Sequence, residues 1–138
     1  MMISSAKEFI HLRDSTVKEE YDRSAYEEAP LKVWKEVLEK YSDYARWVVH
    51  NKTVPLEILE ILSFSEDVDI RWEVATKRKL SPELFERLSK DRETTVRVRI
   101  AVNRKTPLSI LDVLCNDEDA DVASGAQMNK EDRVARIG

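Results

Sequence analysis

Residues 96–122 read VRVRIAVNRKTPLSILDVLCNDEDADV and contain one complete copy of the motif that organises the chain. The motif runs from an apolar stretch with arginines, through an Asn-basic corner before Pro107, to a Leu-rich stretch and an acidic segment. Residues 70–96 repeat this pattern, and residues 44–70 repeat it less closely. Self-similarity at a period of roughly 20–50 residues is typical of stacked supersecondary units, so this motif decides the fold.

Two sets of landmarks define the period. The four prolines are spaced by 25, 27 and 25 residues, at Pro30, Pro55, Pro82 and Pro107. A basic residue recurs at a strict interval of 26, at Lys52, Arg78, Arg104 and Lys130. A polar residue precedes each of these, at Asn51, Lys77, Asn103 and Asn129. Chance does not easily place every proline and a full basic column on one period.

Each repeat is predicted to form two short helices. Proline suits the first turn of a helix because its missing N–H is not needed there, and Ser81 and Thr106 are predicted N-caps. The apolar positions that follow have helical spacing and are predicted to be buried: Ile58, Leu59, Leu62, Leu84, Phe85, Leu88, Ile110, Leu111 and Leu114. In the second helix Val74 and Ile100 are predicted core residues. Asn is predicted to close this helix in the left-handed conformation.

Helices of about eight to ten residues are marginal alone in water, so such hairpins must stack on their neighbours. The sequence therefore predicts an all-α fold, an α-solenoid of short helical hairpins with repeats of 26 residues. Residues 1–29 lie outside the repeat register and are expected to form two helices that cap the first repeat. The repeats are assigned to residues 30–129, in one domain with the cap, and residues 130–138 to a C-terminal tail.

The composition is that of one globular domain. The chain has 138 residues, of which 42% are hydrophobic and 36% charged, with a net charge of −4 that argues against a generally basic nucleic-acid-binding protein. Two glycines and four prolines are too few for an all-β fold, and a single cysteine excludes an internal disulfide framework. No apolar run approaches about 18 residues, and the N-terminus has no signal-peptide core. We expect a cytoplasmic protein without membrane contact.

The segment 96–122 resembles the leucine-rich repeat variant, a HEAT-like unit, and the resemblance extends over about residues 45–129. It rests on an aliphatic-Arg start, an apolar pair with Ala, Asn before a Thr/Ser-Pro corner, and Leu pairs before an acidic turn. The resemblance implies a helical-repeat fold that serves as a binding scaffold. Some variant-repeat proteins carry an N-terminal cysteine cluster for iron–sulfur, but here the only cysteine is Cys115. HEAT-like alkylpurine DNA glycosylases share the architecture and bind DNA in a basic, Trp-lined groove.

The first candidate surface is a basic corner, expected to form a ridge where stacked hairpins bring its residues together. Its members are Lys52, Lys77, Arg78, Lys79, Arg104, Lys105 and Lys130. Helix electrostatics offers a structural alternative, since cations are favourable after helix C-termini and the acidic linkers precede N-termini. Of the two interpretations, the structural one is favoured.

The second candidate surface is the outer face of the second helices. Its members are Arg46, Trp47, Arg71, Trp72, Arg97 and Arg99. Trp beside Arg in consecutive repeats is suited to stack bases or to form a protein hot spot. The alternative is that Trp47 and Trp72 pack between repeats, with arginine stems over them. Trp34, by contrast, follows the first-helix core pattern and is predicted to be buried.

Three functions are compatible with these features. The leading one is a non-catalytic protein-binding scaffold, an adaptor or an immunity-type inhibitor, with no cofactor, metal or catalytic residue. The alternative is a nucleic-acid-binding protein that uses the basic corner and the Arg/Trp face. The third is a glycosylase-like enzyme, for which Glu73 beside Trp72 is the one plausible carboxylate. The identity of the partner and the oligomeric state stay open.

Overall fold

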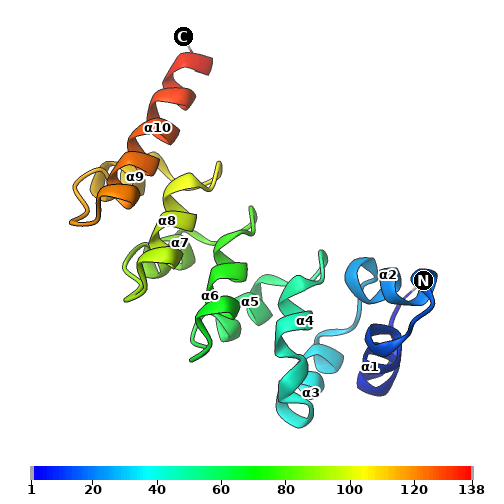
Figure 1. Ribbon diagram of the computed structural model, residues 1–138. Coiled ribbons are helices and arrows are strands. Elements are labelled where there is room, and N and C mark those ends of the chain that lie inside the picture. The colour runs from blue at the N-terminus through cyan, green and yellow to red at the C-terminus, as the bar shows by residue number, and fades with distance from the viewer. Residues whose placement is uncertain (1, 138) are drawn as a thin grey trace. The chain divides into compact units, whose positions relative to one another are not determined.

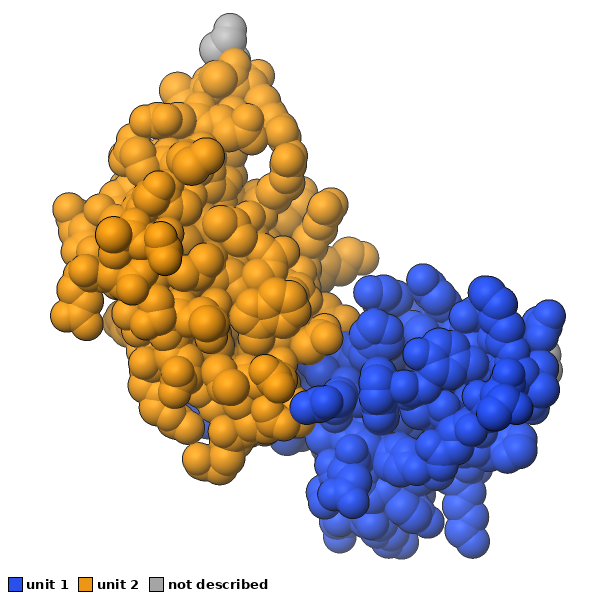
Figure 2. Space-filling model, viewed as in Figure 1, with its two compact units in different colours: residues 1–64 blue, residues 65–138 orange. Residues whose placement is uncertain are grey.

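The computed structural model describes residues 2–137 of a chain that forms two compact units, Met1–Phe64 and Ser65–Gly138 (Figures 1 and 2). Ten α-helices and one 3₁₀ helix make up the regular structure of the described residues, which contain no strand. The all-α class predicted from the sequence is therefore confirmed.

The first unit consists of five α-helices in two layers. Its elements are α1 (Ala6–Asp14), α2 (Lys18–Tyr26), α3 (Leu31–Lys40), the 3₁₀ helix Ser42–Tyr44, α4 (Ala45–His50) and α5 (Leu56–Leu62). Helix α3 contacts α1 and α5 in one layer, and α2 contacts α4 in the other. The two helices expected in residues 1–29 are present as α1 and α2.

The second unit also has two layers. Its helices are α6 (Val68–Ala75), α7 (Pro82–Ser89), α8 (Thr94–Val102), α9 (Leu108–Leu114) and α10 (Ala120–Ile137). Helix α8 contacts both α6 and α10, and α7 contacts α9 in the second layer (Figure 1). The helices α6, α8 and α10 thus lie one after another in one layer (Figure 1).

The repeated apolar columns form the core of each unit, as predicted. Val74 and Ile100 are completely buried, and Phe85 and Leu111 are at most 3% exposed in the same unit. In the first unit Trp34 is fully buried, with its ring edge-to-face to Phe9 at 5.1 Å between centroids. Among the apolar positions predicted for the first helices, Ile110 alone is half-buried rather than buried.

The ends of the second helices differ from the prediction. No described residue has a positive φ, and Asn103 is extended at φ −68° and ψ 123°. The prediction that Asn ends the second helix in the left-handed conformation is therefore wrong. Its side chain instead donates two hydrogen bonds across the unit, to the carbonyls of Ala75 at 2.8 Å and Lys77 at 2.9 Å. Asn103 therefore supplies donors to the end of the helix 26–28 residues earlier.

The same arrangement recurs at the other two asparagines of the column. Asn51 donates to the carbonyls of Ser24 and Glu27 at the end of α2, within the first unit. Asn129 donates to the carbonyls of Ala101 and Asn103 at the end of α8. Hydrogen bonding between hairpins thus accounts for the regular spacing of these asparagines.

The two predicted N-caps have different roles. Ser81 caps α7, because its hydroxyl accepts the N–H of Leu84 at 3.1 Å. Thr106 does not cap α9; its hydroxyl donates to the carbonyl of Ile100 at 2.7 Å, in the last turn of α8. Thr106 is fully buried, and this bond satisfies a polar group that the core encloses.

Residues 130–137 do not form the predicted tail but continue α10, which is 18 residues long. No Gly or Pro interrupts residues 126–137, so nothing in the sequence stops the helix there. Arg133 anchors this extension by donating to the carbonyls of Thr106 and Asn103. None of the helices in the described residues is long and apolar enough to cross a membrane, α10 included.

The equivalence of the core columns predicts a strong stability effect at Ile100. We expect Ile100→Ala to lower the free energy of unfolding by about 2–5 kcal/mol, because it removes buried apolar surface and leaves a cavity. Urea unfolding of the purified chain, followed by circular dichroism, measures this change. The control is Val113→Ala, at a side chain that is 66% exposed. Equal stability of the two variants would contradict the assignment of the core.

Candidate binding surface in the second unit

Two of the arginines assigned to the exposed Arg/Trp face are internal. The side chain of Arg71 is 4% exposed and that of Arg97 is 13% exposed. Arg71 forms a two-point ion pair with Asp91, at 2.9 and 3.2 Å, and Arg97 forms the same pair with Asp117, at 3.0 and 3.3 Å. The expectation that Arg71 and Arg97 lie on the outer surface is wrong, because each has its partner in the loop before the next second helix.

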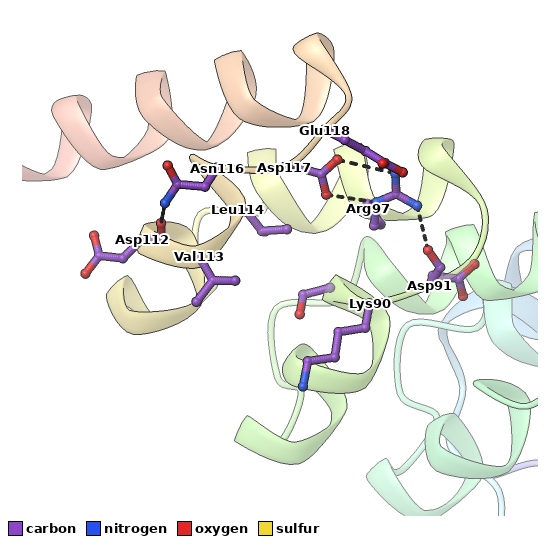
Figure 3. Close-up of a pocket in the computed structure, with 10 residues that line it drawn as sticks. Lys90, Asp91, Arg97, Asp112, Val113, Leu114, Asn116, Asp117 and Glu118 are labelled. Carbon is purple, nitrogen blue, oxygen red and sulfur yellow. Dashed lines mark hydrogen bonds and ion pairs between the residues drawn. The ribbon is translucent and has the colours of Figure 1, made fainter.

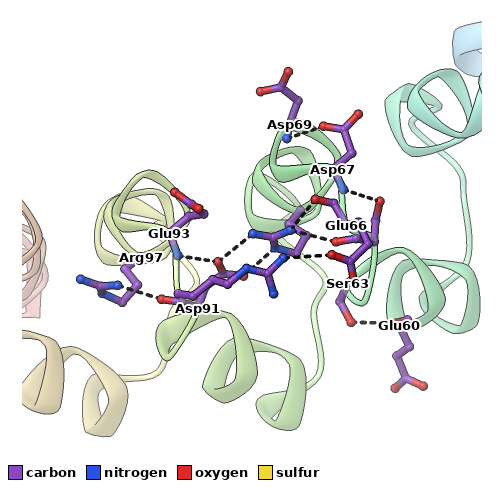
Figure 4. Close-up of polar contacts among 11 residues, drawn as sticks. Glu60, Ser63, Glu66, Asp67, Asp69, Asp91, Glu93 and Arg97 are labelled. Carbon is purple, nitrogen blue, oxygen red and sulfur yellow. Dashed lines mark hydrogen bonds and ion pairs between the residues drawn. The ribbon is translucent and has the colours of Figure 1, made fainter.

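These pairs join into one polar chain through the second unit. Arg71 also donates to the carbonyl of Ser65 at 2.8 Å, before its own helix. Arg97 donates in the same way to the carbonyl of Asp91 at 2.8 Å (Figure 4). Asp91 therefore receives one arginine on its carboxylate and the next on its backbone. Two-point Arg–carboxylate contacts fix orientation as well as distance, so this chain holds successive loops in register.

A sequence signal for these pairs exists. The arginine position reads Ala45, Arg71 and Arg97 at intervals of 26, and the partner position 20 residues later reads Ser65, Asp91 and Asp117. Arginine and aspartate thus appear together and are absent together. Matched columns of opposite charge indicate contact between repeats, a signal that the pattern of a single helix does not contain.

The two residues of the Arg/Trp face in the first unit, Arg46 and Trp47, are not part of this Arg–Asp chain. Trp47 is half-buried, and the guanidinium carbon of Arg13 lies 3.4 Å from the centroid of its ring and 4.4 Å from that of Tyr21. Trp47 is therefore engaged by a cation within its own unit. Arg46 on α4 and Lys52 in the loop after it are exposed.

Trp72 and Arg99, two members of the predicted Arg/Trp face, lie close together. The ring of Trp72 on α6 is 39% exposed, and the guanidinium carbon of Arg99 on α8 lies 6.0 Å from its centroid. Arg99 shares a face of α8 with Val102, three residues later, because helical neighbours are three or four residues apart. Val102 is 41% exposed, so an apolar surface continues from this pair toward α10.

A shallow groove extends this surface between α8 and α10. It has a volume of about 220 Å³ and is lined by Val102, Arg104, Gly125, Met128, Asn129 and Asp132. A Cβ at Gly125 would lie 3.1 Å from Cγ1 of Val102, so the absence of a side chain allows the two helices to approach closely. We call Trp72, Arg99, Val102, Gly125 and Met128 the apolar face.

Part of the predicted basic corner borders this face. Arg78, Lys79, Arg104 and Lys105 are exposed and make no ion pair with any described residue. The two loops that carry them are tied together through Asn103, which donates to the carbonyls of Ala75 and Lys77. Lys77 itself is half-buried. Lys130 lies apart from these residues, in an ion pair with Asp112 at 2.7 Å.

The acidic linkers, by contrast, have structural roles that fit the helix-terminus interpretation. Asp67 accepts the N–H of Asp69 at 2.9 Å at the start of α6. Asp119 accepts the N–H groups of Asp121 and Val122 at the start of α10. A carboxylate that accepts free N–H groups at a helix N-terminus stabilises the helix.

A second depression, of about 680 Å³, is open and lies beside these linkers (Figure 3). Its lining residues are Ser89, Lys90, Asp91, Arg97, Asp112, Val113, Leu114, Asn116, Asp117 and Glu118. Arg97 and Asp117 form part of this lining, and they are already bound to each other in an ion pair. In the described residues no group of three or more His, Cys, Asp or Glu side chains is arranged to hold a metal ion.

Comparison of the chain with protein-family models, with curated proteins and with solved structures gives no match.

The Arg97–Asp117 pair predicts how stability depends on pH. Burial by itself raises the pKa of Asp117, but the N–H of Asp119 and the Arg97 guanidinium outweigh it, so the pKa lies below its usual value of 3.8. The ionised form is thus favoured by folding, and its contribution is present above the usual pKa and is lost as the pH falls through the lowered one. We expect Asp117→Asn to destabilise the chain by about 3 kcal/mol at pH 7, because Arg97 loses its buried partner.

The measurement is guanidinium unfolding of both proteins from pH 7 to pH 2. The stability difference should narrow as the pH falls from 3.8 through the lowered pKa, because the Asp117 carboxyl then takes up a proton first in the unfolded chain and last in the folded one. The matched control is Asp112→Asn, whose carboxylate is 56% exposed and pairs with an exposed lysine, and it should change little. A difference that is independent of pH would contradict the role of the ionised pair.

Proposed function

We propose that this chain is a non-catalytic protein-binding scaffold of the helical-repeat type, similar to HEAT-like and leucine-rich-repeat-variant proteins. In this role it acts as an adaptor or as an inhibitor of another protein, without a cofactor. A single cysteine, Cys115, suits the reducing cytoplasm, where we place the protein. The recurrence of hairpins with the same hydrogen bonds at Asn103 and Asn129 supports the repeat assignment.

The observation that carries the proposal is the apolar face of the second unit. It exposes Trp72, Val102 and Met128 at 39%, 41% and 66% on three neighbouring helices. Trp, Met and Arg are enriched at protein interfaces, and Trp and Arg dominate their binding energy. The helices that carry them are held by buried contacts and by the Arg–Asp chain, so the face is presented on a rigid support.

Nucleic-acid binding is the alternative, and the unpaired cations of the basic corner favour it. Arg78, Lys79, Arg104 and Lys105 are exposed on two adjoining loops, where a phosphate backbone could neutralise them. We place this function second because the exposed surface beside them is apolar. Arg71 and Arg97, which would have extended the positive surface, are neutralised by their aspartates.

Site-specific photo-crosslinking in the source cells tests the proposal. A benzophenone amino acid is placed at Val102 on the apolar face, or at Val113 in the second depression as the control. We expect Val102 to give a discrete protein adduct that resists nuclease, because that surface is buried by the partner. Val113 is the more exposed position, so non-specific collisions would label it at least as strongly.

Two outcomes contradict the proposal. An adduct at Val102 that nuclease degrades would assign the surface to nucleic acid. Equal labelling from Val102 and Val113 would show that neither face has a specific partner.

A further inference from the structure

The groove of the apolar face has the dimensions of a pocket for one side chain. Its volume of about 220 Å³ is below the roughly 300–1,000 Å³ of most small-molecule sites. Val102, Gly125 and Met128 supply the apolar part of its lining, and Arg104, Asn129 and Asp132 supply the polar part. Anchors of this kind are typical of the centres of protein interfaces, where a large side chain enters a preformed pocket.

The charges next to the groove identify the chemistry of the rest of the partner. Elsewhere in the second unit most exposed cations have a carboxylate within 4 Å, in the pairs Lys90–Glu86, Arg92–Glu66, Lys130–Asp112 and Arg136–Asp132. The four exposed cations of the corner, Arg78, Lys79, Arg104 and Lys105, have no such partner among the described residues. Positive charge thus remains unbalanced at this place in a chain whose net charge is −4.

Apolar and cationic features meet at Arg104, which lines the groove with Val102 and Met128. The carboxylate of Asp132 also lines the groove, but it pairs with Arg136 at 3.1 Å. A polyanion such as RNA would satisfy the cations but would leave this apolar surface without a complement. Conversely, a purely apolar segment would leave Arg104 without a partner at a buried edge, which is unfavourable. A segment that combines an apolar anchor with carboxylates satisfies both requirements.

We propose that the apolar face of the second unit binds an acidic amphipathic segment of a partner protein. One apolar side chain of the segment lies in the groove against Val102 and Met128, and a second apolar side chain packs on Trp72. Carboxylates of the segment pair with Arg104 and with the other exposed cations of the corner. This inference rests on the proposed function and adds the chemical class of the partner to it.

A selection from a random 16-residue peptide library displayed on phage, with the whole chain as bait, tests this inference. The affinity of the chain for a random-sequence 20-nucleotide single-stranded DNA is measured in parallel. We expect the enriched peptides to be rich in Asp and Glu around at least one aromatic or large aliphatic residue. For a selected peptide, fluorescence anisotropy should show affinity about tenfold or more lower for Arg104→Glu and for Val102→Asp.

The matched control is Arg92→Glu, which reverses the charge of an exposed arginine elsewhere in the second unit. It should leave the affinity unchanged, and circular dichroism confirms that each variant is folded. Because Val102 is partly exposed and Arg104 is exposed, both substitutions are expected to preserve the fold.

The contradicting outcomes separate this inference from the proposed function. Neutral or basic peptides whose binding depends on Val102 would overturn the acidic partner but leave the protein-binding scaffold intact. Failure to enrich any peptide that depends on Val102 or Arg104 would overturn both. Tighter binding of the DNA than of any peptide, lost in Arg104→Glu and steeply salt-dependent, would assign the surface to nucleic acid.

Discussion

The carbonyl groups at the ends of short helices impose the constraint on which this structure depends. The last four carbonyls of a helix have no donor within it, and α6 to α9 have only seven to nine residues each. Asn103 and Asn129 donate from the next hairpin to the ends of α6 and α8, and Asn51 does so for α2 in the first unit. The ends of α2, α6 and α8 are therefore completed by donors from the hairpin that follows each of them, which helps such short helices to persist.

The functional surface follows from this support. At the other end of the second helices, Arg71 and Arg97 connect consecutive loops through Asp91 and Asp117. Polar contacts hold the ends of the second helices, and the buried apolar residues hold their middle turns. The exposed side chains of α6, α8 and α10 are therefore not required to hold the helices together. Trp72 and Val102 are exposed on helices that are already ordered. Binding of a partner protein there loses less conformational entropy than binding to a flexible segment would.

The sequence alone predicts what is local and periodic. Burial of Val74 and Ile100 follows from spacing within one helix, and the assignment of Trp72 and Arg99 to one face follows from their positions on the second helices. The roles of Asn103 and Arg97 could not be obtained in this way, because their partners lie 20–28 residues away and are backbone carbonyls or loop carboxylates. A helical face defined by spacing alone does not distinguish an arginine that meets solvent from one that meets an aspartate of the next loop.

The most direct test of this account is the stability of Asn103→Asp, which is nearly isosteric. It removes both donated hydrogen bonds and places a carboxylate against the carbonyls of Ala75 and Lys77, while the acceptor for the N–H of Lys105 is kept. Urea unfolding at pH 7 should show a loss of about 3 kcal/mol or more, because buried acceptors are left unsatisfied. The matched variant Asn116→Asp, at an exposed asparagine, should unfold like the wild type. If the two variants are equally stable, hydrogen bonds between hairpins do not hold this fold.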